Sequence, residues 1–242
     1  MEAIRIENLT KRYKNLTAVD NLSVTIEKGE LFSLLGVNGA GKSTTIKMLS
    51  CLTEPSDGNA FLNEKSILSN KAEVKRIIAV SPQETAIAPG LSVIENLKFI
   101  AGVHGFSKEK ADKKTGEIIA ALKLSDIAKR KAGKLSGGWQ RRLSIAMALI
   151  SEPEILFLDE PTLGLDVLAR SELWDIIRSL KGEVTIILTT HYMEEAEALS
   201  DRIGIMADGR LIISGTPEEL KKHASADRLE EAFVRIVKGV AK

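Results

Sequence analysis

The chain has 242 residues, 44% of them hydrophobic, which is enough for one large α/β domain or two small ones. Its formal net charge of +1 argues against a general attraction to nucleic acid or to anionic membranes. The single cysteine, Cys51, excludes an intrachain disulfide and suits a reducing cytosol. The sequence has no run of 18 apolar residues and no signal-peptide pattern, so we expect a cytoplasmic protein that reaches a membrane only through a partner.

The first part of the chain predicts antiparallel strands. Residues 3–8 and 22–27 alternate apolar and polar side chains, as half-buried strands do, and residues 59–63 could add a third such strand. Tyr13 lies between the first two. Its ring could stack on an adenine or could simply cover a turn, and the segment that follows favours stacking.

That segment, residues 36–44, reads Gly-Val-Asn-Gly-Ala-Gly-Lys-Ser-Thr and stands between an apolar run, 31–35, and a helical pattern, 45–49. A strand, a glycine-rich turn, Lys-Ser and a helix in this order form the context of a phosphate-binding loop. The alternative, a glycine-rich turn with a surface lysine, would need neither this spacing nor both flanking elements. Backbone N–H groups of the loop and of the helix N-terminus would bind phosphate oxygens. Lys42 suits the β- and γ-phosphates, and the Ser43 hydroxyl suits Mg²⁺. The expected nucleotide-binding residues here are Gly36, Asn38, Gly39, Ala40, Gly41, Lys42, Ser43 and Thr44.

The middle of the chain changes from alternating strands and helices to helices alone. Residues 76–80 predict a buried strand, and Gln83 just beyond it would lie at the edge of the sheet where ligands bind, unless it is only a satisfied loop amide. Residues 85–150 look like a helical insert, with Ser92 as the N-cap of a helix that starts at Val93. The basic excess over residues 107–134 is best explained as a solvated helix face.

A second anion site is expected near the end of this insert. Leu135-Ser136-Gly137-Gly138 precedes a predicted helix from Trp139 to Ile150, which Ser136 can cap. The two glycines leave backbone N–H groups exposed at the positive end of the helix.

Two acidic residues and a histidine follow predicted buried strands. Residues 155–158 are apolar throughout and end at Asp159 and Glu160, of which one could hold Mg²⁺ and the other could polarise water. Residues 184–190 predict a strand that delivers His191 to the same edge. A hairpin over residues 203–213 follows, and an apolar stripe predicts a helix over residues 229–240 that packs on the chain's own core or on a second copy, unless this terminus frays.

A phosphate-binding loop alone leaves kinases, GTPases, helicases and transport ATPases open. The GTPase motif Asn-Lys-x-Asp is missing, since Asn70-Lys71-Ala72-Glu73 has the wrong last residue and place. The feature that decides among these classes is the segment Leu135-Ser136-Gly137-Gly138, which lies just before residues 155–160. This pairing resembles the ATP-binding subunit of ABC transporters, and the similarity runs from about residue 3 to about residue 220.

The resemblance implies an α/β fold with a P-loop NTPase core and a mostly parallel sheet, an N-terminal antiparallel β subdomain and an inserted helical subdomain at about 85–150, all within residues 1–220, followed by a helical tail at 221–242. It also implies a role for each motif residue. These are Tyr13 on adenine, Gly36 to Thr44 as Walker A, Gln83 as the Mg²⁺-sensing Q-loop residue, Ser136, Gly137 and Gly138 as the signature that acts in trans, Asp159 as the Walker B ligand of Mg²⁺, Glu160 as the catalytic base, Asp166 in the D-loop and His191 as the switch histidine on the γ-phosphate.

One position departs from the family pattern. The signature commonly continues with Gln, and here the residue is Trp139. The role of that glutamine could pass to Gln140, although adjacent helical residues point about 100° apart. Together with the sequences at 189–197 and 229–233, this variation resembles the exporter branch that includes drug, antibiotic and sodium extrusion systems.

The expected ligands are ATP and Mg²⁺, and the expected partners are a second or homologous ATPase subunit in a head-to-tail dimer and a separate membrane permease, with no nucleic acid. The alternative is a non-transport ABC ATPase that clamps DNA or ribosomes. The sequence lacks the sustained heptads of the DNA clamps and has one cassette rather than the tandem pair of the ribosomal ones. A P-loop kinase is disfavoured by the signature.

Overall fold

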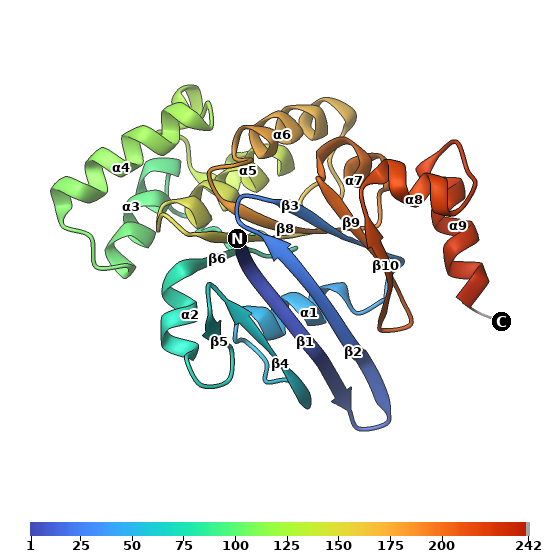
Figure 1. The fold of residues 1–242 in the computed structure, drawn as a ribbon. Coiled ribbons are helices and arrows are strands. Elements are labelled where there is room, and N and C mark those ends of the chain that lie inside the picture. Colours follow the sequence, from blue (N-terminus) through green and yellow to red (C-terminus); the bar gives the residue numbers. More distant parts are fainter. Residues whose placement is uncertain (241–242) are drawn as a thin grey trace.

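The computed structural model describes residues 1–240, in which two β-sheets are packed with helices (Figure 1). The smaller sheet is antiparallel where its strands pair, and its order is β2-β1-β4-β5. Its strands are β1 (Glu2–Tyr13), β2 (Leu16–Glu27), β4 (Asp57–Leu62) and β5 (Lys65–Ser66). The three antiparallel strands predicted from alternation are confirmed, and the first two are longer than predicted.

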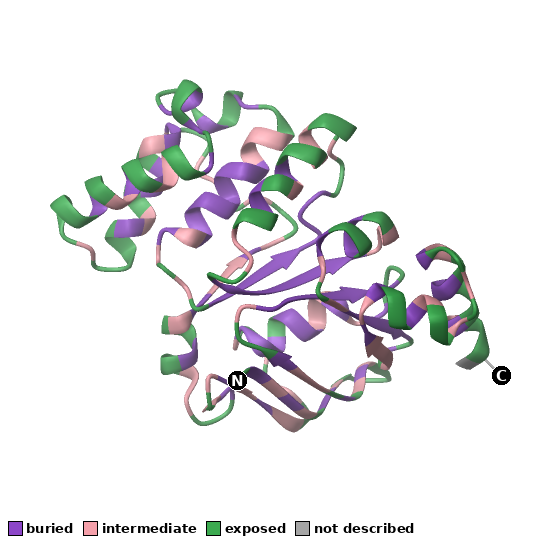
Figure 2. Ribbon diagram, turned by 45° about the horizontal axis from the view of Figure 1, so that its top comes forward, coloured by how far each residue is buried: buried purple, intermediate pink, exposed green. Residues whose placement is uncertain are grey.

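The larger sheet has six strands in the order β10-β9-β3-β8-β7-β6, and every pairing in it is parallel except that of β9 with β10. The strands are β3 (Leu31–Leu35), β6 (Ile78–Ser81), β7 (Ile155–Asp159), β8 (Thr185–Thr190), β9 (Arg202–Ala207) and β10 (Arg210–Gly215). Every residue of β3, β7 and β8 is buried, as expected for central strands covered on both faces (Figure 2). The parallel strands therefore bring their carboxyl ends to one common edge.

The strand predicted over residues 76–80 starts later than expected. Arg76 and Ile77 end the helix α2 (Lys71–Ile77), and the strand β6 begins at Ile78. The segment Lys-Ala-Glu-Val-Lys-Arg is rich in strong helix formers, and it places Val74 in the core and its charged residues outside. Helical propensity therefore takes these two residues from the strand.

The helices divide the fold into layers around the larger sheet. Helix α1 (Lys42–Leu49) lies between the two sheets, where Ile46 and Leu49 join a core with residues of both (Figure 1). The other face of the larger sheet is covered by α5 (Gly137–Leu149), α6 (Val167–Ser179) and α7 (Met193–Leu199). The α/β fold and its P-loop NTPase core are as predicted.

The predicted helical insert is present and has its own core. It contains α3 (Val93–Val103), α4 (Lys108–Ala121), two short 3-10 turns at residues 125–127 and 132–134, and α5. Ser92 caps α3 as predicted, because its hydroxyl accepts from the Glu95 N–H and the Glu95 carboxylate accepts from the Ser92 N–H. The basic residues Lys110 and Lys114 pair with Glu152 near the surface, which agrees with a solvated face.

The C-terminal segment folds onto the chain's own core. Helix α8 (Pro217–His223) spans the boundary expected at residue 220, and α9 (Leu229–Val240) follows. The predicted apolar stripe is confirmed at Leu229, Ala232, Phe233 and Ile236, which are buried in one cluster with residues of β3, β9 and α7. The side chain of Val240 lies outside the described residues. Among the helices that are described, none has the length and apolar character needed to cross a membrane.

Candidate nucleotide-binding site

The predicted phosphate-binding loop connects β3 to α1 at the common edge of the larger sheet. Gly41 has φ of +100°, and a Cβ there would lie 2.5 Å from the Ala18 carbonyl oxygen. A Cβ on Gly36 would lie 2.5 Å from the carbonyl oxygen of Met206. Both positions therefore require glycine, one for its backbone conformation as well as space and the other for space alone.

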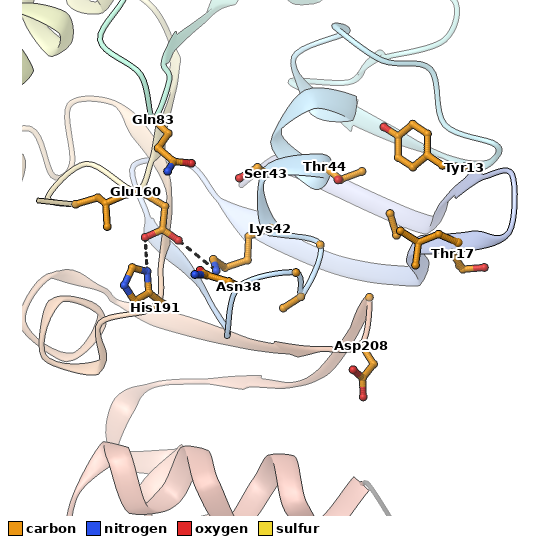
Figure 3. A pocket seen from close by; sticks show the side chains of 17 residues that line it. Tyr13, Thr17, Asn38, Lys42, Ser43, Thr44, Gln83, Glu160, His191 and Asp208 are labelled. Atoms are coloured by element: carbon orange, nitrogen blue, oxygen red, sulfur yellow. Dashed lines mark hydrogen bonds and ion pairs between the residues drawn. The ribbon is translucent and has the colours of Figure 1, made fainter.

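Lys42 is buried at the centre of this site. Its Nζ donates to the carbonyl oxygens of Gly36 at 2.7 Å and Val37 at 3.2 Å, and it lies 3.2 Å from Glu160 Oε1. The other oxygen of that carboxylate, Oε2, lies 2.6 Å from His191 Nδ1, so an ionised Glu160 selects the tautomer with hydrogen on Nδ1 (Figure 3). Three predicted site residues thus form a continuous polar chain.

Asp159 lies at the tip of β7 and faces the start of α1. Its Oδ1 accepts from the hydroxyl of Ser43 at 2.9 Å and from that of Thr189 at 2.5 Å. The Ser43 hydroxyl and the Asp159 carboxylate are the hard oxygen ligands that Mg²⁺ prefers. The two residues are far apart in the sequence, and the adjacent ends of parallel strands bring them together.

The backbone at Glu160 is unusual. Its φ is +48°, in the left-handed region that a residue with a side chain rarely adopts. The Glu160 N–H donates to the Thr189 hydroxyl at 3.0 Å and to the Thr189 carbonyl at 3.1 Å, which ties this conformation to the neighbouring strand β8. Strained residues of this kind cluster at functional sites because the surrounding structure must hold them in place.

Lys42, Ser43, Glu160 and His191 line one pocket of ≈ 690 Å³, within the range of ligand sites, whereas Gly36 and Asp159 lie behind its wall. Besides the loop residues from Asn38 to Thr44, the pocket is lined by predicted site residues from four other segments, namely Tyr13, Gln83, Glu160 and His191 (Figure 3). Tyr13 stands on the exposed end of β1, with Lys11 Nζ 5.0 Å from the centre of its ring. The structure therefore brings these predicted site residues together on one cavity, and their roles stay predictions.

Some lining residues were not predicted. Residues 16–18 come from the start of β2, Leu163 comes from the loop after β7, and Asp208 and Gly209 form the turn of the β9–β10 hairpin. Both turn residues have positive φ, as a two-residue type I′ turn requires, and the Gly209 carbonyl accepts from the Asp20 N–H at 2.8 Å. The nearness of Tyr13 in sequence was the one signal for residues 16–18.

The signature residues lie outside this pocket. Ser136 and Gly137 are exposed and Gly138 is half-buried at the start of α5, and none of the three lines the cavity. Ser136 occupies the N-cap position, as predicted, but its hydroxyl makes no capping hydrogen bond. The prediction that its side chain caps the helix is therefore wrong. Gln140 instead donates to the carbonyls of Leu135 at 3.1 Å and Ala132 at 3.3 Å, and Trp139 lies against Arg142, whose Cζ is 4.3 Å from the ring centre.

Asp166 is the N-cap residue that precedes helix α6. Its carboxylate accepts from the Ala169 N–H at 2.9 Å, which is an N-cap contact. Asp166 is not among the residues that line the pocket, although Leu163 of the same loop is. Its D-loop role stays a prediction.

Residues 1–240 contain no cluster of three or more His, Cys, Asp or Glu side chains that could form a closed metal site. Mg²⁺ at a nucleotide site commonly takes only one or two protein ligands and completes its shell with water and phosphate oxygens. Ser43 and Asp159 fit that pattern, and Gln83 lines the same pocket.

Fold and site together define a P-loop ATPase. The phosphate-binding loop leads from a buried parallel strand into a helix, a carboxylate faces the Ser of the loop, and a second carboxylate meets both the loop lysine and a histidine. The chain belongs to the ABC transporter family, whose model matches residues 19–163, and it is an ATP-binding cassette ATPase.

Similar proteins include three bacterial ATP-binding proteins of transport systems. The daunorubicin/doxorubicin resistance protein DrrA of Streptomyces peucetius is 40% identical over 94% of this chain and 69% of its own length. The linearmycin resistance protein LnrL of Bacillus subtilis is 38% identical over 98% of this chain and 79% of its own. The probable multidrug transporter protein YbhF of Escherichia coli is 38% identical over 97% of this chain, which spans only 41% of that relative.

Solved structures agree with the fold. An ATP-binding subunit of an ABC transporter matches with a TM-score of 0.85 and 26% identity, covering 97% of this chain and 99% of its own. A dimeric ATP-binding cassette bound to ADP and Pi matches with a TM-score of 0.78 and 28% identity, covering 88% of this chain and 98% of its own.

Proposed function

We propose that this chain is the ATP-hydrolysing subunit of a membrane exporter and that two such subunits act together. The observation that carries this proposal is the separation within one chain of two anion-binding elements. Lys42, Glu160 and His191 meet on the pocket, whereas the signature residues are exposed away from it. A signature with no nucleotide site of its own suits the γ-phosphate of ATP held by a second subunit, in a head-to-tail pair.

The proposed reaction gives a role to each residue of the site. Tyr13 stacks on adenine, the loop N–H groups and Lys42 bind the phosphates, and the His191 ring contacts the γ-phosphate. Glu160 accepts a proton from the attacking water while His191 Nδ1 orients its carboxylate. Ser43 and Asp159 would hold Mg²⁺, with Gln83 beside them, and the ion supplies charge neutralisation at the phosphate oxygens.

The membrane partner is proposed to meet the insert near Gln83. On α3, Phe99 and Val103 are 58% and 67% exposed, and the neighbouring Ile100 lines an apolar groove together with Pro82 of the Gln83 loop. Exposed apolar side chains beside a loop of the active site suit a protein partner whose movements are coupled to hydrolysis. This partner would keep the chain at the cytoplasmic face of a membrane.

Glu160→Gln tests the mechanism, because it keeps size and removes the base. ATP hydrolysis should fall about 10²–10⁴-fold, the usual effect of losing a general base, which is roughly 3–5 kcal/mol in the barrier. ATP should still bind, since a negative charge near the γ-phosphate is lost, and the variant should form an ATP-dependent dimer on size-exclusion chromatography. Glu183→Gln, at an exposed position before β8, is the matched control and should hydrolyse normally. Hydrolysis by Glu160→Gln at the wild-type rate would refute the proposed mechanism.

The cargo is proposed to be an antibiotic or a similar drug. The names of the three bacterial relatives supply this class, since they refer to daunorubicin and doxorubicin, linearmycin and multiple drugs. Cells with the wild-type chain should accumulate less daunorubicin than cells in which Glu160→Gln replaces it at equal abundance. Equal accumulation of daunorubicin in the two kinds of cell, together with normal ATP hydrolysis by the wild-type protein in vitro, would reject this cargo. The proposed ATPase activity would be unaffected by that result.

A further inference from the structure

Arg141 of α5 joins three segments at the edge of the active site. Its side chain is buried, with a residue exposure of 4%, and its guanidinium binds main-chain carbonyls. Nη2 donates to the carbonyl of Asp159 at 2.7 Å and Nε donates to that of Pro161 at 2.9 Å. Nη1 donates to the carbonyl of Pro82 and lies 3.4 Å from that of Gln83. One side chain thus connects the signature helix with the ends of β6 and β7.

The contacts on β7 enclose the proposed base. Asp159 and Pro161 are the neighbours of Glu160, and Arg141 holds the carbonyl of each. Between these two contacts the backbone of Glu160 adopts its left-handed φ of +48°. A positive φ in a residue with a side chain persists only when its surroundings hold it, and two hydrogen bonds from one rigid planar fork on both sides of the residue do so.

The electrostatic surroundings keep this fork charged. Burial lowers the pKa of Arg141 to about 10, while the carboxylates of Asp159, Glu195 and Glu160 act in the opposite direction. The side chain is therefore protonated at neutral pH. Transferring a cation from water to the protein interior is unfavourable, and the hydrogen bonds to the carbonyl oxygens offset this cost. The buried charge of Arg141 therefore depends on these contacts.

We propose that Arg141 is a positioning residue for ATP hydrolysis, which fixes the Glu160 carboxylate through the backbone on both sides of it and ties Gln83 to the same helix. The inference rests on the proposed role of Glu160 as the base. Among the described residues, Gln83 is the pocket-lining residue to which Arg141 donates a hydrogen bond, and Arg141 itself does not line the pocket. It therefore acts through other residues rather than on ATP.

The neighbouring arginine provides a contrast. Arg142 is also buried, but its Nη2 donates at 2.6 Å to Glu172, which is largely exposed, and its guanidinium lies on the Trp139 ring. It makes none of the carbonyl contacts described for Arg141. The two adjacent arginines on α5 therefore bind different groups, Arg141 main-chain carbonyls and Arg142 side chains.

The test measures steady-state hydrolysis of ATP by Arg141→Ala and Arg141→Lys. We expect kcat to fall about 10–10²-fold, since a misplacement near 1 Å of a catalytic group costs up to about 10²-fold, while KM for ATP changes less than about threefold. Lysine should not restore the rate, because its donors all lie on one nitrogen, whereas Arg141 uses three separate nitrogens to reach the carbonyls of Asp159, Pro161 and Pro82. Guanidinium chloride at millimolar concentration should partly rescue Arg141→Ala, and sodium chloride at the same concentration should not.

A double-mutant cycle separates positioning from a general loss of structure. In the Glu160→Gln background, Arg141→Ala should change the residual single-turnover rate less than about twofold, because residues that act as a unit are not additive. An equal fold-loss in both backgrounds, or an unchanged kcat in Arg141→Ala alone, would overturn the inference. If Arg141→Ala does not fold, Arg141→Lys replaces it in the cycle with the same expected outcomes.

The control variant is Arg202→Gln, which removes hydrogen bonds to the Thr25 carbonyl and to Glu30 far from the pocket. It should lower the melting temperature without the loss in kcat. If Glu160→Gln hydrolyses ATP at the wild-type rate, the proposed base and the inference fail together. If Glu160→Gln is slow and the Arg141 effect is additive, only the inference fails.

Discussion

The two anion-binding elements of the chain differ in how much of their surroundings the chain itself provides. The phosphate-binding loop is held at both ends, where Gly36 lies against Met206 and Gly41 against Ala18. Its lysine already has three oxygen partners, from Gly36, Val37 and Glu160. The signature lies at the surface, and the hydroxyl of Ser136 makes no capping contact. Both elements begin a helix, so the helix N-terminus is common to them and does not explain the difference.

On the proposed function, the difference concerns which half of the site is complete in the monomer. The loop half can bind a nucleotide without help, because its donors, its lysine and its carboxylates are held by one another. On the proposed head-to-tail pairing, the signature half would offer its donors to the ATP of a second subunit. We therefore expect nucleotide binding to depend on the loop half alone and hydrolysis to depend on both halves.

The largest effect on binding should come from Lys42→Ala. The change removes the ammonium expected to face the β- and γ-phosphates and leaves the buried Glu160 without its cationic partner. A hydrogen bond to a charged group contributes about 1.5–3 kcal/mol, so ATP affinity should fall roughly 10–150-fold. Isothermal titration with ATP measures this loss, and an unchanged affinity would contradict the role of the loop.

A smaller effect, on hydrolysis only, should come from Gly137→Ala. A Cβ at this position meets no atom within 4 Å in the chain, so the fold and monomeric ATP binding should be unaffected. Hydrolysis should fall about tenfold, or ~1.4 kcal/mol, because the added methyl group stands where a second subunit's ATP would approach.

Gly138→Ala is the contrast, since its Cβ would lie 2.9 Å from the Ala169 Cβ and should lower the melting temperature as well. A tenfold loss of ATP binding by monomeric Gly137→Ala would break the division between the two halves.

The smallest effect, on thermal stability, should come from Glu195→Gln on helix α7. Burial raises the pKa of Glu195, and its Oε2 has no hydrogen-bond partner in the part of the chain that is described, while its Oε1 accepts from Trp174 Nε1 at 3.1 Å. A raised pKa in the folded state means that this group's contribution to stability is full below the unfolded pKa and is lost as pH rises through the folded value.

The variant should therefore melt higher than the wild type at neutral pH, by no more than about 2–4 °C, the shift that ~1 kcal/mol gives a chain of this size. The advantage should vanish at acid pH below the ordinary range of glutamic acid. Thermal unfolding monitored by circular dichroism at several pH values checks both. A melting difference that grows as pH falls would contradict the assigned sign.

Much of the loop half was predictable because each part is signalled locally. The glycine spacing of residues 36–44, the apolar run before Asp159 and the strand before His191 are patterns within short windows. Parallel strands bring their carboxyl ends to one edge, so the meeting of Ser43 with Asp159 and of Glu160 with His191 follows from the topology.

Other features depend on contacts between distant segments that no local pattern records. Residues 16–18 and the turn at Asp208 reach the pocket only because two hairpins are docked side by side, joined by the bond from Asp20 to Gly209. Arg141 and Arg142 are the same residue type in the same helix. Only the packing of β6 and β7 against α5 sends one to carbonyl oxygens and the other to Glu172.

The partners of Arg141 have a consequence for how such a site evolves. Each partner is a main-chain carbonyl, and every amino acid supplies one. Substitutions at positions 82, 83, 159 and 161 would leave the acceptors in place, so selection on this contact falls on a single position. Correlated substitutions reveal contacts between side chains, so they would not reveal the contacts of Arg141 with these carbonyls.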